Sequence, residues 1–164
     1  MDAQLTILDE FGARLANVTV ANGYRFDIAS GSIRRAQLTP FQNGDLPAIN
    51  YWPTTDELNK KEFGKETRSF DVTVEAYAVN PDDPFTDSAF KLGNDIVTAL
   101  YRATSAPLTT DPKSYALGGL VSGLETNSIT PLIVESQDPW FAVLLSFNIK
   151  YNITTGDFSA IQSY

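Results

Sequence analysis

Cysteine and histidine are both absent from this chain of 164 residues. Without cysteine, neither disulfides nor thiolate metal sites can form. Without histidine, the chain lacks the commonest general base near neutral pH. The glycine patterns GxxxxGK[ST] and GxGxxG, which cradle phosphates, do not occur, and neither does the GxSxG pattern of serine hydrolases. We therefore expect a protein that is not an enzyme and that holds no cofactor.

Long apolar runs and positive charge are also scarce. No stretch of about 18 apolar residues is present, so we expect no membrane span. The opening MDAQLTILDEF lacks a basic start, so we expect no signal peptide. Lys and Arg number 12 against 20 Asp and Glu, which gives a net charge of −8. Because DNA affinity comes mostly from basic side chains that neutralise phosphates, we expect no specific DNA binding.

The clearest positive signal is the alternation between Trp140 and Ile153. Apolar side chains occupy every second position from Phe141 onward, and mostly small or polar residues stand between them. Period two over this length predicts a long strand with one buried face. A second alternating segment, Thr67–Val79, predicts a long neighbouring strand. Both need a layer that covers their apolar side.

Two helices supply that layer. Residues 3–18 carry an apolar stripe at helical spacing, with Asp2 as the expected cap; the stripe consists of Ile7, Leu8, Phe11, Leu15 and Val18. A second helix is expected to about Arg102, with Asp83 as its cap and Pro84 at its first position. Its Lys91 and Asp95 are expected to form an exposed pair.

Shorter strands complete the predicted domain. They are expected at Gly31–Thr39, Leu46–Trp52, Tyr115–Glu125 and Ile129–Glu135, with a connection at Pro107–Ser114 and a turn at Ser136–Pro139. The order of elements predicts an α+β fold, a mainly antiparallel sheet with two helices packed on one face. We expect one domain over residues 1–153 and a loose C-terminal tail over residues 154–164.

The polar segment Thr54–Glu66, TTDELNKKEFGKE, has no clear period. It is predicted to be either a mobile surface loop or a loop that a neighbouring molecule orders. Phe63 supports the second interpretation, because it has no obvious core position. Candidate contacts with another subunit or with a partner are Arg34, Arg35, Asp56, Glu57, Lys60, Lys61, Phe63, Lys65, Phe158 and Tyr164.

Acidic and aromatic side chains offer two further kinds of site. Asp82, Asp83 and Asp87 have the oxygen ligands that Ca²⁺ or Mg²⁺ takes, but acids at a helix start are also favoured by the helix dipole. We assign no metal and keep these three as candidates. Aromatics such as Trp52 and Trp140 can stack on sugars or bases, or can simply pack at the rim of the core.

Taken in order, several segments resemble the tail terminator proteins of long-tailed bacteriophages, the family that includes the minor tail protein U of lambda-like phages. The resemblance covers most of the chain. It lies in the N-terminal helix and the break at Val18–Tyr24, the strand with Arg34-Arg35, the segments Pro47–Ile49 and Arg68–Ala78, the helix at Asp95–Leu100 and the final Phe147–Tyr151. The tail at Thr155–Tyr164 lies beyond it.

The resemblance implies a structural protein of the virion. Members of this family form a hexameric ring at the head-proximal end of the tail, stop polymerisation of the tail tube protein and present a surface to the head–tail connector. Genomic DNA passes through the lumen without specific binding, and assembly takes place in the host cytoplasm. An acidic chain is compatible with that passage, because it repels phosphates.

Other functions remain open at this point. One is another head–tail joining or tail completion protein, which binds DNA-filled heads rather than tube ends. A second is a monomeric module that binds a sugar or a peptide through exposed aromatics. A third is a hydrolase with two converging carboxylates, one with a raised pKa.

Overall fold

A computed structural model describes residues 2–28, 30–82, 84–102, 117–133 and 139–162. Its elements are α1 (Ala3–Leu15), β1 (Ile33–Arg35), β2 (Ala48–Pro53), β3 (Glu57–Glu62), β4 (Lys65–Val79), α2 (Phe85–Tyr101), β5 (Gly123–Ile133) and β6 (Trp140–Thr154). Short 3-10 turns lie at Val20–Asn22, Ser30–Ser32, Asn43–Asp45 and Leu117–Gly119. The predicted α+β fold with a mainly antiparallel sheet is confirmed.

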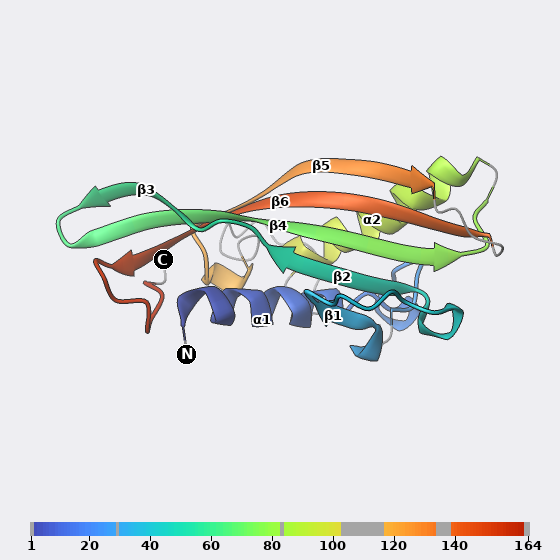
Figure 1. Ribbon diagram of the computed structural model, residues 1–164, viewed down its shortest axis with the longest axis horizontal. Coiled ribbons are helices and arrows are strands. Elements are labelled where there is room, and N and C mark those ends of the chain that lie inside the picture. The colour runs from blue at the N-terminus through green and yellow to red at the C-terminus, as the bar shows by residue number, and fades with distance from the viewer. Residues whose placement is uncertain (1, 29, 83, 103–116, 134–138, 163–164) are drawn as a thin grey trace.

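The sheet is organised around β4 and β6. Its strand order is β1-β2-β4-β6-β5, and β3 pairs with β4 on the same edge as β2. β1 and β2 are parallel, and the other pairs are antiparallel. β4 and β6 pair along their whole length, from Lys65 opposite Thr154 to Val79 opposite Trp140. Both predicted long strands are therefore confirmed, as neighbours in the centre of the sheet (Figure 1).

One face of the sheet is covered by both helices. Alternate residues of β4 and β6 form a single buried core with the apolar stripes of α1 and α2. The Phe11 ring of α1 lies edge-on to Phe147 of β6, with centroids 5.7 Å apart. On α2, a Cβ at Gly93 would lie 2.9 Å from Cγ2 of Ile129, so the glycine permits the close approach of helix and sheet. The predicted stripe of the first helix is buried as expected.

Several predicted boundaries and contacts are wrong. The first helix ends at Leu15, and Asp2 makes no side-chain capping bond. The strand after Gly31 has only three residues, because Ala36 takes a φ of 52° and turns the chain. Pro84 is the N-cap of α2 and not its first residue, while Asp83 lies outside the described residues.

The expected exposed pair on α2 does not form. Asp95 is 4% exposed and pairs with Arg25, at 3.1 Å from Nε, while Lys91 lies 3.4 Å from Asp82. The two strands expected near residues 115–135 are one strand, β5, with an irregularity between Thr126 and Ser128. The connection at 107–114 and most of the turn at 136–139 lie outside the described residues.

The segment predicted as a loop is a β-hairpin. Glu57–Glu62 forms β3, which pairs with the first part of β4 through a two-residue turn at Phe63 and Gly64. Both turn residues have positive φ, 45° and 77°, as a type I′ hairpin turn requires. We call residues 57–69 the arm. β2 and β3 form one interrupted edge, because the N–H of Thr54 donates to the carbonyl of Asp71 at 2.8 Å.

The C-terminal residues after β6 fold back on the domain. The carbonyl of Phe158 accepts a hydrogen bond from the N–H of Ala3 at 2.7 Å. The N–H of Gln162 donates to the carbonyl of Asn152 at 2.8 Å, and Phe158 and Ile161 pack against the core. The expectation of a loose tail therefore does not describe residues 155–162.

Candidate interaction surfaces

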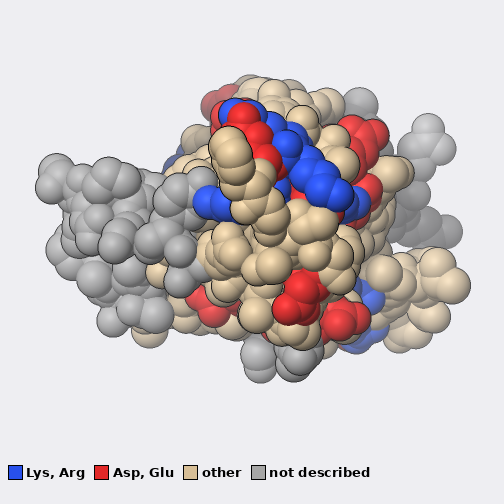
Figure 2. Space-filling view, turned by 90° about the vertical axis from the view of Figure 1, so that its left-hand side faces the viewer, with Lys and Arg blue, Asp and Glu red and all other residues tan. Residues whose placement is uncertain are grey.

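The arm extends the sheet beyond the helices at one end of the molecule (Figure 1). All six residues of β3 are exposed. Phe63, at the tip, is 106% exposed, so its ring has no contact surface within the chain. Lys60 lies 2.9 Å from Glu62 in an exposed ion pair. Figure 2 looks at this end of the molecule and shows basic and acidic side chains gathered side by side near its top.

A polar cluster fixes the base of the arm. Asp56 accepts hydrogen bonds from Gln4 at 2.6 Å, from the Tyr151 hydroxyl at 2.5 Å and from Nε of Arg68 at 3.2 Å. Nη1 of Arg68 donates to Glu66 at 3.1 Å. Burial opposes the charge of Arg68, but Asp56 and Glu66 outweigh it and raise the pKa of Arg68. Burial and the bond to Asp56 also raise the pKa of Tyr151.

This cluster joins distant parts of the chain. Asp56 follows β2, Arg68 lies on β4, Tyr151 on β6 and Gln4 on α1. The ring of Phe158 lies against Arg68, with 5.2 Å between Cζ and the ring centroid. These contacts anchor the base of the arm, and at the tip the carbonyl of Gly64 accepts from the N–H of Thr155 at 2.8 Å, while the Phe63 side chain is fully exposed.

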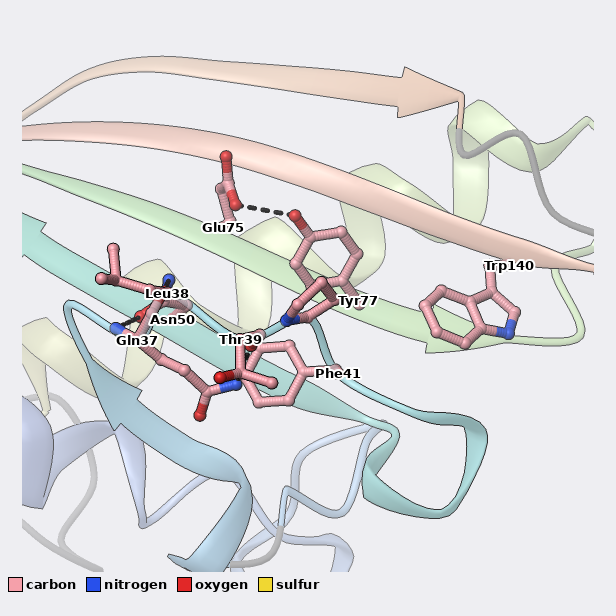
Figure 3. A pocket seen from close by; sticks show the side chains of 9 residues that line it. Gln37, Leu38, Thr39, Phe41, Asn50, Glu75, Tyr77 and Trp140 are labelled. Carbon is pink, nitrogen blue, oxygen red and sulfur yellow. Dashed lines mark hydrogen bonds between the residues drawn. The ribbon is translucent and has the colours of Figure 1, made fainter.

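A groove lies on the sheet face that the helices leave open. The segment after β1, residues 36–41, forms one wall, and the side chains of Asn50, Glu75, Tyr77 and Trp140 form the floor and the other wall (Figure 3). Its volume is about 360 Å³. The Phe41 and Tyr77 rings lie 6.0 Å apart, and the guanidinium of Arg34 lies over Phe41 at 5.1 Å.

Polar contacts hold this groove open. Asn50 pairs with the backbone of Gln37 through two bonds, accepting from its N–H at 2.9 Å and donating to its carbonyl at 3.1 Å. The Trp140 indole donates to Asn43 at 2.5 Å. The Tyr77 hydroxyl donates to Glu75 at 2.7 Å, and burial together with this bond raises the pKa of Tyr77. The polar groups of the groove are thus mainly hydrogen-bonded within the chain, and the surface that remains accessible is mostly apolar.

Leu38 is the most exposed part of the groove. Its side chain is 97% exposed, although both neighbouring residues take part in the wall. Glu75 is the one charged residue among those that line the groove. An apolar rim with a single acid suits a partner that brings an apolar side chain beside a base. It does not bring together two carboxylates, as an acid-pair hydrolase requires.

The structure separates the predicted contact residues into two groups. Glu57, Lys60, Lys61, Phe63 and Lys65 gather on the arm. The others make contacts within the chain: Arg35 pairs with Asp9 at 2.9 Å, and Arg34 with Asp45 at 3.4 Å, while Asp56 and Phe158 belong to the polar cluster. Tyr164 lies outside the described residues.

The acidic metal candidates are not brought together. Asp82 is held by Lys91, Asp87 lies in the first turn of α2, and Asp83 is outside the described residues. Within the described ranges, no three His, Cys, Asp or Glu side chains converge on a position for a metal ion.

Sequence reasoning missed the groove, including Leu38, Phe41 and Tyr77. Leu38 lies in a segment predicted as strand, Phe41 follows that segment, and Tyr77 lies in the predicted strand Thr67–Val79, on the side away from its apolar face. The dipeptide Thr39-Pro40 is the one available signal, since proline breaks a strand and marks where the chain leaves the sheet.

Comparison with protein-family models and with curated proteins finds no match for the chain. No helix among the described residues is long and apolar enough to cross a membrane. The functional argument therefore depends on the two surfaces, the arm and the groove, and on the resemblance of the sequence.

Proposed function

We propose that this protein is a phage tail terminator, a structural protein that assembles into a hexameric ring on the end of the tail tube. The observation that carries the proposal is the arm, a projecting hairpin whose tip exposes Phe63 completely. A large apolar side chain that buries nothing within its own chain can leave water only by contact with another molecule. The resemblance in the order of segments supports the assignment to the tail terminator family.

The two surfaces of the chain suit such an assembly. The arm and the groove differ in shape and charge, as the two halves of a head-to-tail interface must. When the rotation between copies closes, such an interface generates a ring with two unlike faces. One face caps the tail tube protein and prevents its further addition, and the other receives the head–tail connector.

The charge of the chain fits the passage of a genome. The net charge is −8, and DNA is gripped mainly by basic side chains. A lumen lined by such a chain lets DNA pass without trapping it. The protein would then function in the virion, at the head-proximal end of the tail, after assembly in the host cytoplasm.

Electron microscopy and native mass measurement of the purified chain test the proposal. We expect hexameric rings with a central hole, and we expect these rings to bind the ends of isolated tail tubes and stop the addition of tube protein. A chain that is monomeric at all concentrations and that leaves tube growth unchanged would contradict the proposal. Binding to DNA-filled heads rather than to tube ends would indicate another head–tail joining protein.

The groove favours a second candidate, a ligand-binding module. Its Tyr77, Phe41 and Trp140 rings beside Glu75 resemble the apolar pockets with few polar groups that bind small molecules. Such a module would be monomeric and would show saturable binding of a sugar or peptide. Calorimetric titration against these two ligand classes, with the variant Trp140→Ala as control, distinguishes it from a ring protein.

A further inference from the structure

The tip of the arm cannot fill the groove of its own chain. Lys65, beside the tip, and Glu75, in the groove, lie on the same strand, ten residues apart (75 − 65). At about 3.3 Å per residue, this separation is about 33 Å. β4 is paired along its whole length with β6, so it cannot fold back on itself. An arm that enters a groove must therefore come from a second molecule.

The two surfaces complement one another in apolar character. Phe63 offers an aromatic ring on a two-residue turn, with no side chain of its own molecule against it. The groove offers the rings of Phe41, Tyr77 and Trp140 and the exposed side chain of Leu38. Aromatic rings that meet at offset or edge-on angles stabilise each other beyond the area that they bury. The groove has a volume of about 360 Å³, which leaves room for one aromatic ring.

They also complement one another in charge. Residues 60–65 hold three lysines and one glutamate, a net +2 (3 − 1), in a chain whose net charge is −8. The charged residue among those that line the groove is an acid, Glu75, and the one base beside the groove, Arg34 over Phe41, is paired with Asp45. When Phe63 enters the groove, Lys61 and its neighbours come close to this carboxylate. Most other surfaces of an acidic chain would repel a copy, so this pairing also selects the register of contact.

We infer that the arm of one copy inserts Phe63 into the Leu38–Tyr77–Trp140 groove of the next copy. This inference rests on the proposed function, since it names the contact that closes the ring. The contact is heterologous: each copy gives its arm on one side and receives an arm on the other. In the free chain both surfaces are therefore exposed, as the structure shows for Phe63 and Leu38.

Engineered cysteines test the contact directly, because the chain has no cysteine of its own. One preparation carries Glu62→Cys, which is exposed beside Phe63 and leaves the Phe63 ring in place, and a second, isotopically heavy preparation carries Leu38→Cys. A disulfide forms only where two Cα atoms approach within about 7 Å. After mixing and mild oxidation, we expect covalent dimers of mixed mass. The double variant, with both changes in one chain, should give a covalent ladder that ends at the size of the ring.

The control moves the cysteine from the arm to an exposed position on α2 and leaves Phe63 unchanged. Phe90 on α2 is 43% exposed and lies far from the groove in the fold. Phe90→Cys mixed with Leu38→Cys should give a several-fold lower yield of mixed dimers. Equal yields from the two mixtures would overturn the inference. Thermal unfolding of each variant, followed by circular dichroism, checks that the fold is kept.

The inference and the proposed function can fail separately. If the purified chain forms rings that bind tube ends, but Phe63→Ser leaves those rings intact, the inference is wrong and the function stands. If the mixed disulfide forms, but the assembly neither binds nor stops tail tubes, the contact stands and the function is wrong. A chain that never associates contradicts both.

Discussion

β4 is one strand with two unlike halves. From Phe70 to Val79 its alternate side chains are buried under the helices, and its neighbours are β2 and β6. From Lys65 to Ser69 it pairs with β6 and with β3, in which every residue is exposed, although Glu66 and Ser69 of β4 itself are buried. The ladder hydrogen bonds are of the same kind in both halves, and what differs is the burial of the edge strand: β2 has buried residues and β3 has none. The comparison shows that pairing alone can shape a surface, while burial supplies the stability.

The largest effect should come from the buried half. Phe147 of β6 lies opposite Val72 and packs against Phe11, and it is 0% exposed. Phe147→Ala should lower the free energy of unfolding by about 3–5 kcal/mol, because it removes buried area and leaves a cavity. Urea denaturation measures the change. The control Leu58→Ala, on the exposed β3, should shift stability by less than about 0.5 kcal/mol.

A smaller loss is expected at the junction of the two halves. Asp56→Ala leaves Arg68, Tyr151 and Gln4 without their shared acceptor. Partly buried donors without a partner should lower the free energy of unfolding by about 1–3 kcal/mol. The matched control is Asp9→Ala, which breaks the exposed pair with Arg35 and should cost less than about 1 kcal/mol. Equal losses in the two variants, in urea denaturation, would contradict the special role of the cluster.

The turn of the arm should be sensitive for conformational reasons alone. Gly64 has a φ of 77°, and no atom lies within 4 Å of the position that a Cβ would occupy. Gly64→Ala should therefore cost about 1 kcal/mol through backbone strain and not through a clash. Gly44→Ala, also in open space but without positive φ, should leave the melting temperature unchanged. A clear loss in both variants would point to another cause.

The smallest effect on stability should come from the tip. Phe63→Ser removes a side chain that buries nothing within the chain, so the free energy of unfolding should change by less than about 0.5 kcal/mol. Association between copies should nevertheless be lost, as sedimentation velocity can measure. A variant that unfolds more easily, or that still associates like the original chain, would break the division between a stabilising half and a contacting half.

The parts predictable from sequence are those where burial imposes a period. The alternation at Phe141–Ile153 and the stripe from Ile7 to Val18 follow from one buried face each. The sequence predicts the strand and the helix correctly, apart from where each element ends. β3 has no buried face, so ELNKKE carries no period two. β3 forms because residues 65–69 of β4 extend past the helices and provide backbone hydrogen-bond partners. The composition of residues 57–62 gives no sign of this pairing.

The groove was beyond prediction for a different reason. Its residues come from four segments, around Leu38, Asn50, Tyr77 and Trp140, and only the register of the sheet brings them together. The docking of the residues after β6 was equally beyond prediction from sequence, because Phe158 meets Arg68 only through long-range packing. Among the predicted contact residues, five lie together on the arm, where charge and an isolated aromatic draw attention to them in the sequence. Their role in contact stays a prediction, and the residues of the groove do not stand out in this way.

The fifteen-residue ladder between β4 and β6 also sets an order of events during synthesis. Lys65 pairs with Thr154 and Val79 with Trp140, so β4 leaves the ribosome well before its main partner exists. Until residues 140–154 emerge, the apolar face of β4 lacks half of its sheet, and a nascent chain in that state is prone to aggregate. The sheet is therefore complete only after the last strand has emerged. The proposed contact through the arm would follow that step, because the groove includes Trp140.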